Sequence, residues 1–159
     1  MAAPQVNDKV ENFTLQNQDG KTVNLTDFKG KPVVLFFYPR ADTPGCTIES
    51  CGFRDAFKKF QKAGIVVLGI SRDTVKDQKK FAEKFGLNYP LLADTEEKVC
   101  KQFDVLKEKN MYGKKVMGIE RTTFVIGEDQ TLMKIFPKVT PEGHAEEVLA
   151  VLDAEGSAF

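Results

Sequence analysis

Cys46 has the clearest setting for chemistry in this sequence of 159 residues, because it stands where a helix is expected to begin. Thr43 suits an N-cap, and Pro44 suits the first helical position. The first turn of a helix offers unpaired backbone N–H groups and the positive end of the helix dipole, and both stabilise a thiolate. Cysteines in such settings can have pKa values of roughly 3.5 to 7.5. We therefore expect Cys46 to be partly or largely ionised at neutral pH; the ordinary alternative is a buried structural thiol.

The helix after Cys46 is predicted from its hydrophobic spacing. Phenylalanines recur on one helical face until Gly64 ends the pattern: Phe53, Phe57 and Phe60. Cys51 would lie on the same helix, five residues after Cys46. That step separates the Cα atoms by about 8 to 9 Å, whereas a disulfide requires no more than about 7 Å. The pair therefore predicts a redox switch that works only when the first helical turns unwind.

A buried strand leads directly into this helix. Residues 33–38 are β-branched and aromatic without polar alternation, which is typical of a strand buried on both faces of a parallel or mixed sheet. Earlier in the chain, Asp19-Gly20 between residues 13–16 and 22–25 is a strong signal for an N-terminal β-hairpin. Cys46 is therefore expected just after a central strand.

The rest of the chain continues the alternation of strands and helices. The predicted elements are a helical turn at 25–28, a strand at 65–71, a helix at 74–85, a strand at 89–93, a helix at 95–103, strands at 122–126 and 132–136, and a helix from 140 or 141 to 152. Residues 110–118 are predicted to form a surface loop, and 154–159 a frayed tail. This order predicts one domain over residues 1–159 with an α/β, thioredoxin-like fold: helices flank a central mixed β-sheet, and the hairpin is added at the N-terminus.

The composition excludes several classes of partner. The chain carries 23 basic and 23 acidic residues, a balance that provides no field for nucleic acid or an anionic membrane. Residues 1–11 contain no apolar core of a signal peptide, and no stretch approaches the roughly 18 apolar residues of a membrane span. Three cysteines without a secretory signal fit a reducing compartment. We expect a cytoplasmic protein, and no exposed apolar surface in the sequence argues against a monomer.

The residues around Cys46 resemble the active-site motif of a known family. Pro39, Thr43 and Cys46 match the PxxxTxxC pattern of the peroxiredoxins, and the cysteine five residues later is similar to the PrxQ or bacterioferritin comigratory protein (BCP) subfamily. Three further segments also fall where that family has them: residues 13–15, 66–71 and 121–124. The resemblance covers nearly the whole chain and implies a thiol-dependent peroxidase with a thioredoxin-like fold and no prosthetic group.

The resemblance also implies a role for each residue of the motif. Cys46 would be the peroxidatic cysteine, whose thiolate attacks the O–O bond of hydrogen peroxide or an organic hydroperoxide and becomes a sulfenic acid. The Thr43 hydroxyl would bind thiolate and peroxide, although a plain N-cap is an equal alternative. Pro39 would shield the cysteine. Arg121, which alone would be taken for a surface charge, would lower the pKa of the thiol and donate to the reacting oxygens.

The second half of the implied cycle involves Cys51. The resemblance implies that Cys51 resolves the sulfenic acid as an intramolecular disulfide with Cys46, and that thioredoxin or a related dithiol protein reduces it. Cys100 competes for this role, but its helical neighbours predict a core position. Glu49, one turn after Cys46, either orients Arg121 or complements the helix dipole. It is left out of the predicted catalytic set.

Two other kinds of protein are compatible with parts of the sequence. A thioredoxin-like thiol–disulfide oxidoreductase without peroxidase activity would share the fold, but the chain has no CxxC motif. A zinc-binding module could use the three cysteines and His144, but no pair of them has the short spacing of known zinc sites. His144 itself follows Pro141-Glu142-Gly143 and is predicted to be exposed, without a catalytic role.

Overall fold

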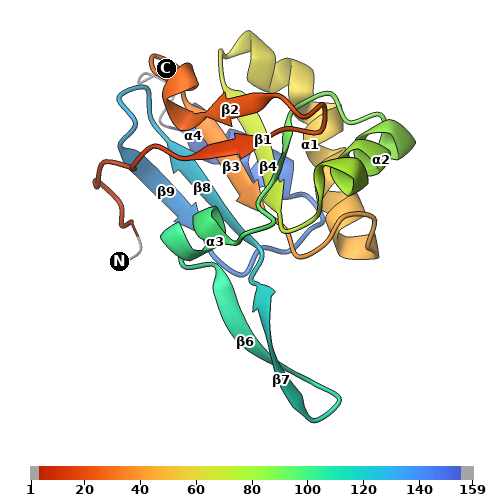
Figure 1. Cartoon of the computed structure of the whole chain (residues 1–159). Coiled ribbons are helices and arrows are strands. Elements are labelled where there is room, and N and C mark those ends of the chain that lie inside the picture. The colour runs from red at the N-terminus through yellow and green to blue at the C-terminus, as the bar shows by residue number, and fades with distance from the viewer. Residues whose placement is uncertain (1–3, 155–159) are drawn as a thin grey trace.

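The computed structural model describes residues 4–154 and contains a seven-stranded β-sheet with helices packed against it (Figure 1). The strands of this sheet are β1 (Thr14–Gln16), β2 (Thr22–Asn24), β3 (Val33–Phe37), β4 (Val66–Ser71), β5 (Leu91–Ala93), β8 (Thr122–Ile126) and β9 (Leu132–Phe136). The helices are α1 (Pro44–Lys62), α2 (Val75–Phe85), α3 (Lys98–Gln102) and α4 (His144–Ala154), with a 3-10 turn at Leu25–Phe28. Two further strands, β6 (Leu106–Met111) and β7 (Lys114–Ile119), form a separate hairpin. The predicted α/β class is confirmed.

Strand β3 lies inside the sheet, whose strand order is β2-β1-β5-β4-β3-β8-β9. It pairs in parallel with β4 and antiparallel with β8, and all five of its residues are buried. At one edge of the sheet, β1 and β2 form the predicted antiparallel hairpin. The mixed pairing confirms the thioredoxin-like arrangement, and β3 is the fully buried strand that the sequence predicted.

Two hydrophobic cores lie on opposite faces of the sheet. Alternate residues of a strand face opposite sides, so Phe36 belongs to the core under α1, α2 and α4, whereas Phe37 belongs to the core under α3. Cys46 lies in the first of these cores and Cys100 in the second. The sheet therefore separates these two thiols.

The prediction of a surface loop at residues 110–118 is wrong. β6 and β7 pair along their whole length and form a hairpin that projects from the body of the molecule (Figure 1). The two turn residues, Tyr112 and Gly113, both have positive φ angles of 53° and 78°, as a type I′ turn requires. The hairpin escaped prediction because the first four residues of β7 are all exposed. No buried face imposes the alternating pattern by which a strand is recognised.

Two helices start later than the sequence predicted. Glu97 precedes α3 with a φ of 62°, and Gly143 precedes α4 with a φ of 73°. A right-handed helix does not continue through a residue in the left-handed conformation. Residues 140–143 therefore form a loop before α4, and this loop approaches the start of α1.

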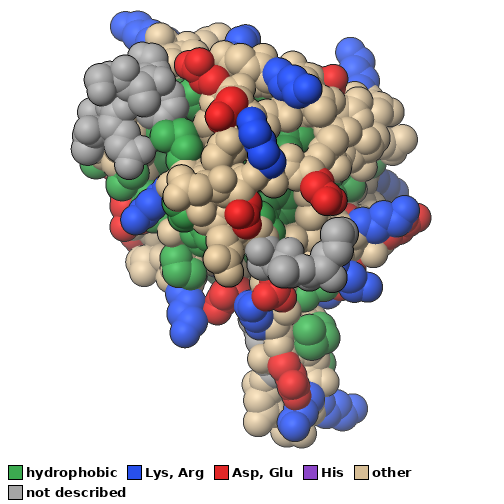
Figure 2. All heavy atoms as spheres, turned by 90° about the vertical axis from the view of Figure 1, so that its left-hand side faces the viewer, with side chains coloured by type: hydrophobic (Ala, Val, Ile, Leu, Met, Phe, Trp, Pro, Cys, Tyr) green, Lys and Arg blue, Asp and Glu red, His purple; other side chains and the backbone are tan. Residues whose placement is uncertain are grey.

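Charged side chains of both signs are interspersed over the face of the molecule seen in Figure 2. This distribution fits the equal totals of 23 basic and 23 acidic residues.

Within residues 4–154, none of the helices has the length and hydrophobicity needed to cross a membrane.

Candidate active site

The start of α1 holds Cys46 in the first helical turn, as predicted. Thr43 occupies the N-cap position with an extended backbone, and its carbonyl accepts a hydrogen bond from the N–H of Thr47 at 2.8 Å. Pro44 is the first helical residue. The Cys46 side chain is fully buried in the core between α1 and the sheet. Its thiol therefore lies at the positive end of a long helix and away from bulk water.

Arg121 reaches the sulfur of Cys46 from the neighbouring strand. It directly precedes β8, whose first residue Thr122 pairs with Phe37 at the end of β3. This register brings Arg121 to the start of α1, where its Nη2 donates to Sγ of Cys46 at 3.4 Å. The Arg121 side chain is only 15% exposed, so the alternative of a surface charge is wrong. A guanidinium in this position favours the thiolate through a charge-assisted hydrogen bond.

Glu49 fixes the other end of the same guanidinium. Its Oε1 accepts a hydrogen bond from Nη1 of Arg121 at 2.8 Å, while its Oε2 is buried without a partner. Burial raises the pKa of Glu49 to about 7, although the charge of Arg121 opposes this shift. Glu49 was not among the catalytic residues predicted from the sequence. Its place one helical turn after Cys46 was the signal that could have included it. Of the two roles considered for Glu49, the buried contact with Arg121 supports the orientation of that arginine.

Gly45 leaves room for the guanidinium beside the helix. A Cβ at this position would lie 3.0 Å from Nη2 of Arg121 and 3.4 Å from Cγ of Pro141. The first distance is shorter than nearly all real contacts of a Cβ atom, whereas the second is at the short end of ordinary van der Waals contact. A larger residue at position 45 would therefore push Arg121 away from the sulfur of Cys46.

Thr43 and Pro39 lie in the turn that connects β3 to α1. The Thr43 hydroxyl donates to the carbonyl of Arg40 at 2.9 Å, and the side chain makes no capping hydrogen bond. Within the described part of the chain, the hydroxyl is thus bonded to this carbonyl and not to the sulfur of Cys46. The lone pairs of the hydroxyl can still accept a hydrogen bond from a bound peroxide. Pro39 is half-buried directly after the buried Tyr38.

The three cysteines are free thiols in different environments. Cys51 is half-buried on α1, and because this helix is continuous, Cys51 cannot bond to Cys46 while the helix is intact. Cys100 is fully buried, as predicted. Burial, together with the neighbouring carboxylate of Asp94, raises the pKa of the Cys100 thiol far above its usual range. Cys100 is therefore a poor nucleophile.

The geometry does not support the zinc-binding alternative. That alternative requires Cys46 and Cys100 to share a site, but they lie in cores on opposite faces of the sheet. Among the residues that the structure describes, no group of three or more His, Cys, Asp or Glu side chains is arranged to hold a metal ion.

The prediction that His144 is exposed is wrong. Its ring is buried, with Nε2 2.7 Å from Oγ1 of Thr123 and Nδ1 2.8 Å from Oε1 of Glu147. Burial lowers the pKa of His144 below its ordinary value, although Glu147 opposes this shift. The polar residues before His144 favoured an exposed turn. The apolar spacing of α4 was the contrary signal, since it places the first turn of that helix against the core.

Comparisons with known proteins identify the family of this chain. Residues 6–135 match the model of the AhpC/TSA family. The chain is 49% identical to a putative peroxiredoxin bcp of Coxiella burnetii, over 93% of this chain and 98% of that protein. It is 46% identical to peroxiredoxin Bcp of Escherichia coli, over 86% and 88% of the two chains. A solved cysteine-to-serine mutant of Xylella fastidiosa PrxQ is 37% identical with a TM-score of 0.93, and the match covers 98% and 99% of the two chains.

The family match and these relatives identify the class of this protein as a thiol-dependent peroxidase with a thioredoxin-like fold. The chain belongs to the AhpC/TSA family and, within it, to the Bcp or PrxQ peroxiredoxins. The resemblance seen in the sequence and the predicted enzyme class are both confirmed.

Replacing Glu49 with glutamine should slow the reaction of the thiol with hydrogen peroxide by about tenfold, because the buried arginine loses its charged partner. Glu49 ionises near pH 7, so Arg121 is held most firmly above that value. The rate constant of the wild type should therefore increase as the pH rises through 7. This increase should be absent in Glu49→Gln. Second-order rate constants from competition with a haem peroxidase, measured across this pH range, would show both effects. Equal rates and equal pH profiles would contradict the positioning role of Glu49.

Proposed function

We propose that Cys46 is the peroxidatic residue and that this protein reduces hydrogen peroxide and organic hydroperoxides. The observation that carries the proposal is the buried sulfur of Cys46 at the start of α1, with Nη2 of Arg121 at 3.4 Å. The thiolate attacks one peroxide oxygen and the O–O bond breaks. The other oxygen takes a proton and leaves as water or an alcohol, and Cys46 becomes a sulfenic acid. The guanidinium donors stabilise the negative charge that develops on the oxygens.

Thr43 and Pro39 complete the site in this proposal. The Thr43 hydroxyl already donates to the carbonyl of Arg40, so it accepts a hydrogen bond from the peroxide and holds it in line for attack. Pro39 has no backbone N–H and covers the approach to the thiol without offering a competing donor. Their position in the turn before α1 supports these roles.

Cys51 resolves the sulfenic acid. Its sulfur attacks the sulfur of Cys46, a disulfide forms, and the hydroxyl leaves with a proton as water. The first turns of α1 unwind for this step, because two residues five apart on an intact helix are too distant to bond. The poor reactivity of Cys100 and its location beyond the sheet support Cys51 as the resolving residue.

A dithiol protein of the thioredoxin type then returns the enzyme to its reduced form. It reduces the Cys46–Cys51 disulfide by thiol–disulfide exchange and leaves with a disulfide of its own.

Alkyl hydroperoxides are included among the proposed substrates because a related protein of known structure reduces them. That protein is the Xanthomonas campestris bacterioferritin comigratory protein, which is 43% identical to this chain with a TM-score of 0.86.

The proposal extends to a single domain over residues 1–159 that acts as a monomer in the cytoplasm. The three free thiols support a reducing compartment. No prosthetic group enters the mechanism, because a thiolate alone supplies the electrons that break the O–O bond.

The replacement Cys51→Ser tests the resolving step. Turnover in a coupled assay with thioredoxin, thioredoxin reductase, NADPH and hydrogen peroxide should fall by about 10²-fold or more, because no intramolecular disulfide forms. Each chain should still consume about one equivalent of peroxide in the first turnover. Cys100→Ser is the matched control and should change turnover by less than about twofold. Equal turnover by wild type and Cys51→Ser would contradict the resolving role.

A further inference from the structure

The segment that precedes and begins α4 packs against the turns of α1 that the proposed resolving step unwinds. This segment, residues 141–145, is called the α4 latch below. Cγ of Pro141 lies 3.4 Å from the position that a Cβ on Gly45 would occupy. Cβ of Ala145 lies 3.8 Å from the corresponding position on Gly52. The α4 latch therefore lies beside α1 just before Cys46 and again just after Cys51.

His144 ties the α4 latch to both α1 and the sheet. Its ring meets the ring of Phe53 on α1 edge to face, with centroids 5.7 Å apart and planes at 84°. It meets Phe136 of β9 in the same way, at 5.4 Å and 82°. Its Nε2 lies 2.7 Å from Oγ1 of Thr123 on β8. One buried side chain thus joins α1, α4 and two strands.

We propose that His144 is a positioning residue for the resolving step, because it holds the Cys46–Cys51 segment of α1 in its helical form. The inference rests on the proposed function, in which that segment unwinds. In the closed form, α1 is helical and packs against the α4 latch; in the opened form, the Cys46–Cys51 segment is unwound. Edge-to-face ring contacts and buried hydrogen bonds each stabilise the closed form. The strength of the α4 latch therefore sets how fast Cys51 reaches the oxidised Cys46. It also sets how long the sulfenic acid is open to further oxidation.

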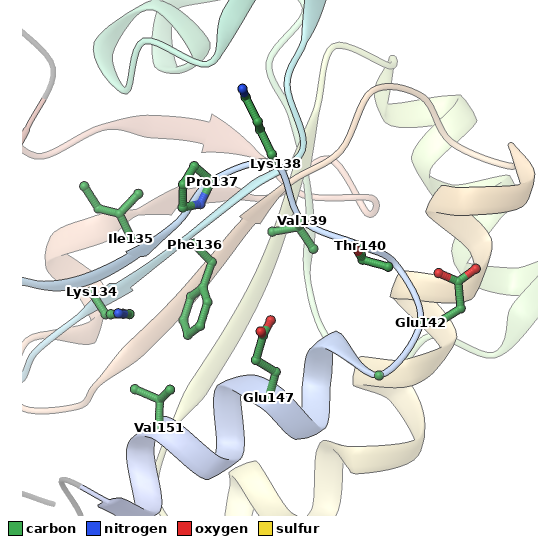
Figure 3. A pocket seen from close by; sticks show the side chains of 11 residues that line it. Lys134, Ile135, Phe136, Pro137, Lys138, Val139, Thr140, Glu142, Glu147 and Val151 are labelled. Atoms are coloured by element: carbon green, nitrogen blue, oxygen red, sulfur yellow. The ribbon is translucent and has the colours of Figure 1, made fainter.

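Glu147 gives the buried ring a route to solvent. Its side chain is about 60% exposed and lines an open cavity of about 580 Å³ between the end of β9 and α4. Figure 3 shows the Glu147 side chain rising from α4 among the residues of this cavity. Because a carboxylate only accepts hydrogen bonds, Nδ1 of His144 carries the proton of the neutral ring, and Nε2 accepts from Thr123. A second proton on Nε2 would reverse this last hydrogen bond, since the Thr123 hydroxyl can also accept, and would place a positive charge on the buried ring.

The α4 latch should therefore weaken in acid. The charged groups that act on His144 are Glu147 on its own helix and Arg121 before β8. The contacts from α1, β8 and β9 come from uncharged side chains, namely Phe53, Thr123 and Phe136. Burial lowers the pKa of His144, so the opened form binds a proton more readily than the closed form. The contribution of neutral His144 to the closed form is therefore complete above about pH 6.5, the ordinary pKa of histidine, and decreases as the pH falls below it.

Hydrogen exchange of the reduced protein tests the α4 latch without any oxidation. His144→Ala should speed exchange of the amides of residues 47–53 by about tenfold, the change expected from losing one buried hydrogen bond. Thr123→Val removes only the hydroxyl partner and should act in the same direction. Val105→Ala is the matched control, because Val105 is buried in the core on the other face of the sheet. Exchange in His144→Ala no faster than in Val105→Ala would overturn the inference.

Rapid-quench kinetics link the α4 latch to the reaction. After oxidation, the Cys46–Cys51 disulfide should form about tenfold faster in His144→Ala, while the first reaction with peroxide stays within about twofold of wild type. This acceleration should shrink as the pH falls from about 7.5 to about 5.5, because protonation of His144 in the opened form weakens the wild-type latch. Equal disulfide formation rates in wild type and His144→Ala would overturn the latch alone. A wild type that forms no Cys46–Cys51 disulfide would overturn the proposed function.

Discussion

The variant Cys46→Ser should lose peroxidase activity by at least about 10⁴-fold, the largest effect expected from a single side chain in this protein. A serine hydroxyl stays protonated at neutral pH and does not attack the O–O bond, whereas a thiolate does. The replacement nearly conserves volume, and Cys46 is fully buried, so the fold should persist. Peroxide consumption in the thioredoxin-coupled assay would measure the loss.

The thiols left in that variant provide its internal control. Cys51 and Cys100 are both present in Cys46→Ser, so a general reaction of protein thiols with peroxide would leave measurable activity. Cys51→Ser, which keeps Cys46, should still react with peroxide at the wild-type rate in its first turnover. Activity in Cys46→Ser within about tenfold of wild type would show that the nucleophile lies elsewhere.

The variant Arg121→Lys should lower the second-order rate constant for hydrogen peroxide by about 10²-fold. Arg121 donates from Nη1 to Glu49 at 2.8 Å and from Nη2 to Cys46 at 3.4 Å. A lysine keeps the positive charge, but its single ammonium cannot reproduce this planar pair of donors. The loss should fall on the rate of sulfenic acid formation, which trapping with dimedone would follow.

A second arginine gives the matched control for this change. Arg72 also pairs with a glutamate, Glu97, at 2.9 Å, but it directly follows β4, and its charge acts on Cys100, which lies in the core on the other face of the sheet from Cys46. Arg72→Lys should therefore leave the peroxide reaction within about twofold of wild type. Equal losses in the two variants would mean that Arg121 acts through general stability and not through the reacting atoms.

The junction of β3 and α1 could be predicted from the sequence because its signals are local. The apolar run of β3, the N-cap position of Thr43 and the proline after it all act within a few residues. The two N-terminal strands were equally accessible through their Asp19-Gly20 turn.

Other features could not be predicted because they depend on contacts between distant segments. Glu49 and Arg121 are 72 positions apart, and only the pairing of β3 with β8 brings them together. His144 looked like a polar residue in a turn, yet the packing of α4 against the core buries its ring. The sequence predicted a helix here, but helical spacing alone does not show which polar residue is buried with the apolar face.

Mapping of the oxidised thiols tests whether Cys46 and Cys51 form the proposed redox pair. The reduced protein is treated with one equivalent of hydrogen peroxide, digested with trypsin and analysed by mass spectrometry. Cleavage after Arg40 and Arg54 leaves Cys46 and Cys51 together on the peptide 41–54, whereas Cys100 leaves on 99–101. If the Cys46–Cys51 disulfide forms, as we expect, peptide 41–54 becomes lighter by two hydrogen atoms. A cross-link to peptide 99–101, or unchanged masses for both peptides, would contradict it.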